Sequence, residues 1–414
     1  MIALAITAAI VVAYSLFQRR LSKTILGGPL IFVAFGLIAS PEGLGLFTLD
    51  LDAELVQILL KATLVVLLFT EASELPTRNI IREASLPGRL LFIAMPVVIA
   101  LGGALALWLL TGVDLFWQAA LLGAILAPTD AALGQPVVSN PRVPGPIRRS
   151  LTVEAGLNDG LAVPFAYLFA ALAEIFHGEE GGPTFLEFLF DQIVLGIAIG
   201  IAVGWLGAKA ANAARRNGWT SASWLQVGFL GIAVVSFALA EGVDGNGFIA
   251  AWIAGFVFRN TKEEDLHAAG FAEESGHVLT LLSFFVFGAI LLPPALDAIN
   301  GWFIVYALAS LLLVRPIAVW ISMFRAGLRL PTIAYLGWFG PRGIASLVLA
   351  VLVAKKFDVP GIETILEVMT VTVALSVLLH GVTAWPGSNA YANWIDRNGS
   401  EPLDRFRPNE TNEF

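Results

Sequence analysis

Long apolar segments alternate with short polar ones along most of the chain, up to about residue 385. A helix that crosses a membrane needs about 20 predominantly apolar residues. By this criterion the sequence predicts thirteen membrane-spanning helices, near residues 2–17, 25–40, 53–72, 88–110, 116–138, 149–176, 187–212, 223–241, 246–258, 272–294, 302–324, 331–355 and 362–385. The pattern therefore predicts an all-α membrane protein, with a transmembrane domain over residues 1–385 and a short polar tail over residues 386–414.

Composition supports this prediction and excludes several kinds of chemistry. Charged residues make up 14% of the chain and the mean hydropathy is +0.80, whereas soluble domains contain about 25% charged residues. The absence of cysteine excludes disulfides, thiol catalysis and thiolate metal sites, and the four histidines are dispersed. No basic tract suggests nucleic acid. We therefore expect no cofactor, no enzymatic activity and no nucleic-acid partner, and the lipid bilayer as the surroundings.

The distribution of positive charge predicts the orientation in the membrane. Positively charged residues concentrate in cytoplasmic loops. Nineteen of the 24 Lys and Arg residues lie in the loops after the odd-numbered helices from the first to the eleventh, or in the tail. The cluster Arg19, Arg20 and Lys23 follows the first apolar segment, so this segment is expected to be a retained helix rather than a signal peptide. The expected location is the cell (inner) membrane, with the N-terminus outside and the C-terminus in the cytoplasm.

Two of the predicted helices contain residues that interrupt a helix. The fifth has Pro128, Thr129 and Asp130 near its middle, and the twelfth has the run from Gly340 to Gly343. Proline removes a backbone donor and clashes with the preceding turn. Paired interruptions are typical of secondary transporters built from inverted repeats. The two helices are seven spans apart and therefore run in opposite directions, and we expect two inverted six-helix repeats, helices 2–7 and 8–13, with helix 1 left over.

The two interruptions carry charges of opposite sign. The N-termini of half-helices are partially positive and their C-termini partially negative. We expect Asp130 to offset positive helix ends at the first break. Arg342 is expected to offset negative ends at the second, or to pair with a carboxylate. The alternative is that both breaks are simple kinks whose polar groups face water-filled vestibules.

The sixth predicted helix contains Glu154, Asn158 and Asp159. An ionisable side chain within a span costs roughly 2.5–3.5 kcal/mol on insertion scales. Glu154 and Asn158 lie on one helix face, and Asp159 lies about 100° further round. This arrangement predicts an ion pathway with Asp159 at its centre.

These motifs resemble those of the monovalent cation/proton antiporter family, which includes the bacterial NhaP-type and the animal sodium/proton exchangers. The segment LAPTDAALGQPVV resembles the Thr-Asp motif of the first broken helix, TVEAGLNDGLAVP the Glu-x-x-x-Asn-Asp motif, and GWFGPRGIASLVLA the Gly-x-Arg-Gly segment of the second broken helix. A weaker match is LLFTEASELPTRNIIR, at the end of the third helix. The resemblance covers residues 1–385 in the order of the family.

The resemblance implies roles for individual residues. Asp159 would bind the cation or the proton in turn, and Asp130 and the main chain of Thr129 would line the same monovalent-cation site. Asn158 would be the partner of Asp159. Glu154 would form a buried ion pair with Arg342.

Two positions of the implied site are left open. Glu71 aligns best with an acidic site residue found in part of the family, and Glu74 is the competing alignment. Relatives often have Ser after the motif Glu, but this chain has Ala155, so water or another residue must supply that oxygen.

The resemblance also implies a mechanism and an assembly. A proton and a cation compete for Asp159, and because Asn158 does not titrate, one proton is expected to exchange for one cation without net charge movement. Sodium is the first expectation, with lithium and potassium as alternatives. The implied assembly is a homodimer, with helices 1–3 and 8–10 at the interface and helices 4–6 and 11–13 as the ion-transport core.

Two other classes of membrane protein, a cation channel and an intramembrane enzyme, fit the sequence less well. A cation channel is less compatible with paired broken helices and a single carboxylate. An intramembrane enzyme is remote, because no HExxH or comparable catalytic motif is present. Arg315, before Pro316, is expected to cap freed carbonyl groups and receives no functional role.

Overall fold

The computed structural model describes residues 2–21, 24–47, 51, 53–74, 85–111, 113, 116–176, 190–263 and 269–399. All regular elements in these ranges are helices, and each of the thirteen predicted spans coincides with one helix or with a run of helices. Eight helical segments of the described part are long and apolar enough to cross a membrane, and α2 and α7 are shorter apolar helices. The prediction of an all-α, multi-span membrane protein is confirmed.

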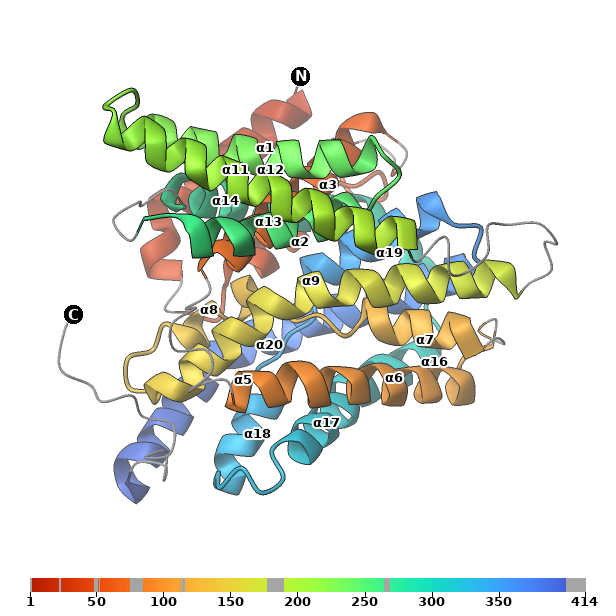
Figure 1. Ribbon diagram of the computed structural model, residues 1–414. Coiled ribbons are helices and arrows are strands. Elements are labelled where there is room, and N and C mark those ends of the chain that lie inside the picture. Colours follow the sequence, from red (N-terminus) through yellow and green to blue (C-terminus); the bar gives the residue numbers. More distant parts are fainter. Residues whose placement is uncertain are drawn as a thin grey trace.

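One group of helices forms the upper layer in Figure 1. Within it α13 packs against α3, α11 and α12, while α14 packs against α2 and α3. Its members are α1 (Ile2–Leu21), α2 (Gly28–Ala39), α3 (Glu54–Glu74), α11 (Gly196–Arg216, after the π-helical segment Phe190–Leu195), α12 (Ala222–Glu241), α13 (Gly247–Thr261) and α14 (Gly270–Val286).

The second group lies below it in the same view, with α9 and α19 at the boundary (Figure 1). Its members are α5 (Ser85–Arg89), α6 (Met95–Leu109), α7 (Phe116–Ile125), α8 (Ala131–Val138), α9 (Gly145–Ile175), α16 (Gly301–Ala309), α17 (Arg315–Ser322), α18 (Leu330–Trp338), α19 (Ile344–Lys356) and α20 (Ile362–Asn398). The short helix α15 (Leu292–Asp297) continues α14 through the π-helical turn Phe287–Leu291 and packs against α20. Contacts of α9 and α19 with α3 join the two groups.

The packing shows an internal repeat, and it corrects the partition expected from the sequence. The fifth and twelfth spans are both broken, and π-helical turns, Leu90–Ala94 and Ser310–Val314, lie in the fourth and eleventh spans just before a proline-containing helix start. Each pair is displaced by seven spans. The repeats are therefore spans 1–6 and 8–13, and α11, the seventh span, connects them.

Two close helix contacts are also related by this shift of seven spans. A side chain at Gly36 would overlap the carbonyl oxygen of Phe285, and one at Gly255 would overlap that of Phe69. Gly36 and Gly255 belong to spans two and nine, and the two Phe residues to spans ten and three. Glycine at both places lets the backbones approach closely, as is common where helices meet in membranes.

The last helix is longer than expected. The prediction ends it at residue 385, but α20 continues through Pro386 to Asn398. Side-chain contacts hold this extension: Asn140 Nδ2 donates to Ser388 Oγ at 3.0 Å, and Arg142 Nη2 donates to Asn389 Oδ1 at 2.7 Å. Residues 400–414 of the predicted tail lie outside the described residues, as do residues 75–82 of the fourth motif.

Candidate functional site

Two extended segments cross where the broken helices are interrupted. Residues 126–130 separate α7 from α8, and residues 339–343 separate α18 from α19. The backbone N–H of Asp130 donates to the carbonyl oxygen of Pro341 at 2.8 Å. Since the interrupted backbone lacks the bonds of a continuous helix, each segment supplies partners to the other.

Asp130 caps two half-helices at once. Its Oδ1 accepts hydrogen bonds from the N–H groups of Ala132 at 2.7 Å and Leu133 at 3.2 Å, at the start of α8. Its Oδ2 accepts one from the N–H of Ile344 at 3.0 Å, at the start of α19. A carboxylate is favourable at a helix N-terminus because the unpaired N–H groups there carry partial positive charge. The expected role of Asp130 at the first break is thus found, and it extends to the second.

Gly343 leaves space for this carboxylate. A Cβ atom at this position would overlap Oδ2 of Asp130. Any side chain there would displace the carboxylate from the start of α19.

Arg342 provides the opposite charge in the same crossing. Its fully buried guanidinium donates from Nη1 to the carbonyl oxygens of Ala127 at 2.8 Å and Pro128 at 3.3 Å, just beyond the C-terminal end of α7. Its backbone N–H donates to Ser376 Oγ at 2.7 Å. Arg342 therefore offsets the negative end of the first broken helix, while Asp130 of the first offsets the positive end of the second.

The expected Glu154–Arg342 ion pair is wrong, because Glu154 pairs with Arg315. Nη1 and Nη2 of Arg315 donate to the two carboxylate oxygens at 2.8 and 3.0 Å, and both side chains are 4% exposed. Nη2 also lies 3.4 Å from the carbonyl oxygen of Leu336, so the expected contact of Arg315 with freed carbonyl groups is present as well.

Two features of the backbone explain this choice of partner. Arg315 follows directly on the π-helical turn Ser310–Val314, which shifts the helix face that comes after it. A Cβ atom at Gly340 would overlap the Arg315 guanidinium, so the glycine makes room for it. Arg342 is meanwhile turned toward the carbonyl groups of the crossing.

Asn158 binds Thr129 through side chains. Its Nδ2 donates to Thr129 Oγ1 at 2.7 Å, and both residues are buried. From the sequence, Asn158 was expected to be the partner of Asp159, and Thr129 to line the site with its main chain. In the structure the side chains of Asn158 and Thr129 bind each other, and this bond joins α9 to the broken helix. Oδ1 of Asn158 has no hydrogen-bond partner among the described residues.

Asp159 is 6% exposed, and its Oδ1 has no partner among the described residues. Glu71 and Asp130 are close enough to interact with it electrostatically. Glu74 instead interacts with Glu273 and Lys262. The structure thus brings Glu71, rather than Glu74, to Asp159.

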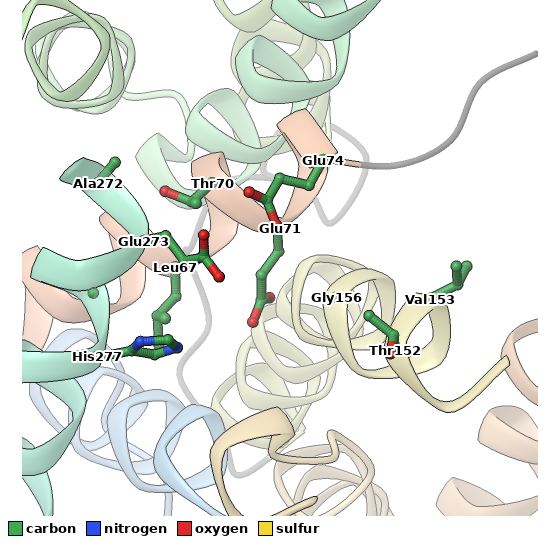
Figure 2. A pocket seen from close by; sticks show the side chains of 11 residues that line it. Leu67, Thr70, Glu71, Glu74, Thr152, Val153, Gly156, Ala272, Glu273 and His277 are labelled. Atoms are coloured by element: carbon green, nitrogen blue, oxygen red, sulfur yellow. The ribbon is translucent and has the colours of Figure 1, made fainter. Parts of the chain in front are cut away.

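Glu71 also borders a cavity of about 190 Å³ between α3, α9 and α14. Figure 2 shows its side chain extending from α3, between Thr70 and Glu74, toward α9. There its Cβ lies 3.3 Å from the position that a Cβ of Gly156 would take. The carboxylate oxygen Oε2 of Glu71 has no partner among the described residues.

The residues of the site offer mainly oxygen atoms as possible ligands. A hard monovalent cation takes oxygen ligands, and carboxylate, amide and hydroxyl oxygens gather here. Within the described ranges, no three His, Cys, Asp or Glu side chains are arranged to hold a metal ion.

Sequence reasoning missed three features of the site. The role of Arg315 was signalled only by a charge inside an apolar span, and that of Ser376, which accepts from Arg342, had no signal. The cavity depends on residues of α14 such as Glu273 and His277, which are far from the motifs along the chain.

A sequence model of the family described as "Sodium/hydrogen exchanger, transmembrane" matches residues 5–386 of this chain. The chain belongs to the sodium/hydrogen exchanger family. The family expectation from the sequence motifs is confirmed.

Two curated relatives of this family are named as potassium/proton antiporters. The chain is 28% identical to the K(+)/H(+) antiporter NhaP2 of Shewanella oneidensis over 92% of its own length and 64% of the relative. It is 25% identical to the K(+)/H(+) antiporter NhaP of Alkalimonas amylolytica over 96% of its own length and 68% of the relative. The chain thus spans about two thirds of the length of these relatives.

A solved structure has the same fold. The sodium proton antiporter MjNhaP1 from Methanocaldococcus jannaschii at pH 8 superposes with a TM-score of 0.76 and 21% identity, over 92% of this chain and 99% of that one.

Proposed function

We propose that this protein exchanges a monovalent cation for a proton across the membrane, with Asp159 binding each in turn. One observation carries the proposal. Asp159 is a buried carboxylate with an unpartnered oxygen, next to the crossing of two broken helices inside a membrane domain. Membership of the sodium/hydrogen exchanger family supports it.

Competition for one carboxylate is sufficient for exchange. An ionised Asp159 attracts a cation, and a protonated one does not. Asp159 carries no net charge when it holds either the cation or the proton, and an empty, charged carboxylate is costly to move through a low-dielectric barrier. The site therefore changes sides with a cation or with a proton, and this couples their movements.

The neighbours of Asp159 support an electroneutral 1:1 exchange. Asn158 does not titrate, and its amide is bound to Thr129. Asp130 is held by three backbone N–H groups at the starts of two half-helices, and we assign it this structural role rather than proton exchange. If Glu71, the other buried carboxylate beside Asp159, keeps one protonation state through the cycle, Asp159 is the group that changes its proton and one cation replaces one proton.

Potassium and sodium are the two cations to test first. The names of the two relatives support potassium, and the sequence reasoning favours sodium. Both are hard cations that the oxygens of Asp159, Asn158 and Glu71 can bind, with lithium as a further candidate.

The orientation and assembly follow from the charge pattern and the resemblance. Lys and Arg residues of the loops support an N-terminus outside the cell membrane and a cytoplasmic C-terminus. We place the homodimer interface on spans 1–3 and 8–10 and the moving core on spans 4–6 and 11–13.

Proteoliposomes with an internal pH-sensitive dye test the function. A gradient of potassium or sodium should drive proton movement with the wild type and with Asp297→Asn, an exposed residue at the end of α15, but not with Asp159→Asn. Cation-driven proton movement that persists in Asp159→Asn would overturn the role of this residue. A current that follows the membrane voltage would contradict 1:1 exchange, and a non-saturating flux without proton movement would indicate a channel.

A further inference from the structure

Thr70 has a buried hydroxyl group without a hydrogen bond. The residue is 5% exposed, and its Oγ1 has no partner among the described residues. A helical threonine commonly donates to the carbonyl group four residues earlier, as the hydroxyls of Thr63, Thr152, Thr372 and Thr383 do here. Burying a hydroxyl without such a bond costs free energy. The exception at Thr70 therefore points to another partner.

Thr70 is one of the residues that line the cavity between α3, α9 and α14. Figure 2 shows the carboxylate of Glu273, from α14, directed into the space that Thr70 and Glu71 border. Glu74, Thr152 and His277 are the other polar residues of the lining, and Lys262 interacts electrostatically with Glu74. The cavity lining thus has the neutral hydroxyl oxygen of Thr70 near three carboxylates, those of Glu71, Glu74 and Glu273.

We propose that this cavity holds a second monovalent-cation site, in which Thr70 Oγ1 and the carboxylates of Glu71 and Glu273 bind a partly hydrated cation. The proposal rests on the exchange function proposed above and adds a binding step before Asp159. A volume of about 190 Å³ accommodates a cation with several waters, since water occupies about 30 Å³ in the liquid. The acidic lining raises the local concentration of cations.

Glu71 links this site to the exchange site. It lines the cavity and also interacts electrostatically with Asp130, while Asp159 interacts with Glu71 in turn. The proposed second site and the exchange site therefore share the carboxylate of Glu71. The cavity is formed by the C-terminal end of α3 and the N-terminal ends of α9 and α14, which the positive-charge pattern assigns to the cytoplasmic side.

The first test measures the cation concentration that gives half-maximal exchange. Thr70→Val removes the hydroxyl but keeps the shape, and it should raise the KM for the cation by about threefold to tenfold, the range expected for one lost ligand contact. Thr70→Ser retains the hydroxyl and should restore a KM within about twofold of the wild type. Glu273→Gln should also raise the KM, whereas Glu274→Gln should not, because it removes the same charge from the neighbouring exposed residue, which is outside the cavity lining.

The second test measures binding where exchange is blocked. Purified Asp159→Asn should still gain thermal stability on addition of potassium or sodium chloride, relative to N-methylglucamine chloride at equal ionic strength. That gain should disappear in Asp159→Asn/Thr70→Val and persist in Asp159→Asn/Glu274→Gln. An unchanged KM in Thr70→Val, or a gain in stability that the double variant keeps, means that the hydroxyl binds water only and overturns the second site. Absence of exchange in the wild type, with binding intact in Asp159→Asn, refutes the exchange function but not this site.

Discussion

Asp130 accepts a hydrogen bond from the backbone N–H of Ile344 at 3.0 Å, and this bond ties the two broken helices together. The same carboxylate caps its own half-helix α8. One charged group thus stabilises the N-termini of two half-helices that are more than 200 residues apart along the chain.

Removal of this carboxylate should destabilise the crossing. We expect Asp130→Ala to lower the free energy of unfolding by about 2–4 kcal/mol, because it leaves N–H groups of two helices without an acceptor. Asp130→Asn should lower it less, since Oδ1 can still cap α8. Denaturation in detergent measures both, with Ser221→Ala at the exposed start of α12 as the control. Equal losses for Asp130→Ala and Ser221→Ala would contradict the double cap.

Gly343→Ala should impair exchange without removing any charged group. The added methyl group overlaps Oδ2 of Asp130 and displaces it from the start of α19. We expect at least a tenfold loss of exchange rate, since a 1 Å misplacement of a site can cost about 10²-fold. Gly134→Ala is the matched control, because no atom lies within 4 Å of a Cβ there. Similar rates in the two variants would argue against a steric role for Gly343.

The pair Glu154–Arg315 should dominate the stability of the core around α9. Removing either partner leaves a buried charge and should cost about 3–5 kcal/mol, while replacing both by apolar residues should cost less than the sum. A double-mutant cycle with Glu154→Leu and Arg315→Met measures the coupling. The parallel cycle with Arg342→Met should give a smaller coupling, because Arg342 donates to backbone carbonyl groups instead. A larger coupling energy for Glu154 with Arg342 than with Arg315 would instead support the ion pair expected from the sequence.

The exchange should depend on pH through competition at Asp159. Protons and cations exclude each other from one carboxylate, so the apparent KM for the cation should rise as pH falls. The rise approaches tenfold per pH unit where the protonated form predominates, by mass action. Initial rates at several cation concentrations between pH 6 and 9 measure it. A KM independent of pH, with a maximal rate that changes instead, would point to titration of a group outside the binding site.

The sequence predicted most of the fold because the membrane imposes strong constraints on it. Apolar segments of sufficient length marked the thirteen spans, and the residues around Pro128 and Pro341 marked both breaks. The extension of α20 beyond Pro386 escaped prediction because it is held by specific contacts, such as Arg142 with Asn389, rather than by apolar character. The partition into repeats also needed the matched π-helical turns and the glycine contacts at Gly36 and Gly255.

For the site, the sequence by itself determined which chemical groups the membrane domain contains. Asp130, Asn158 and Asp159 stand out because polar groups in apolar spans are costly. Only the tertiary structure decided which groups meet. From the sequence, Arg342 was the expected partner of Glu154, but the π-helical turn before Arg315 and the space at Gly340 bring Arg315 to it instead. The reason is physical: a pairing depends on helix rotation and on close backbone approach, and neither is encoded in the local pattern of apolar and polar residues.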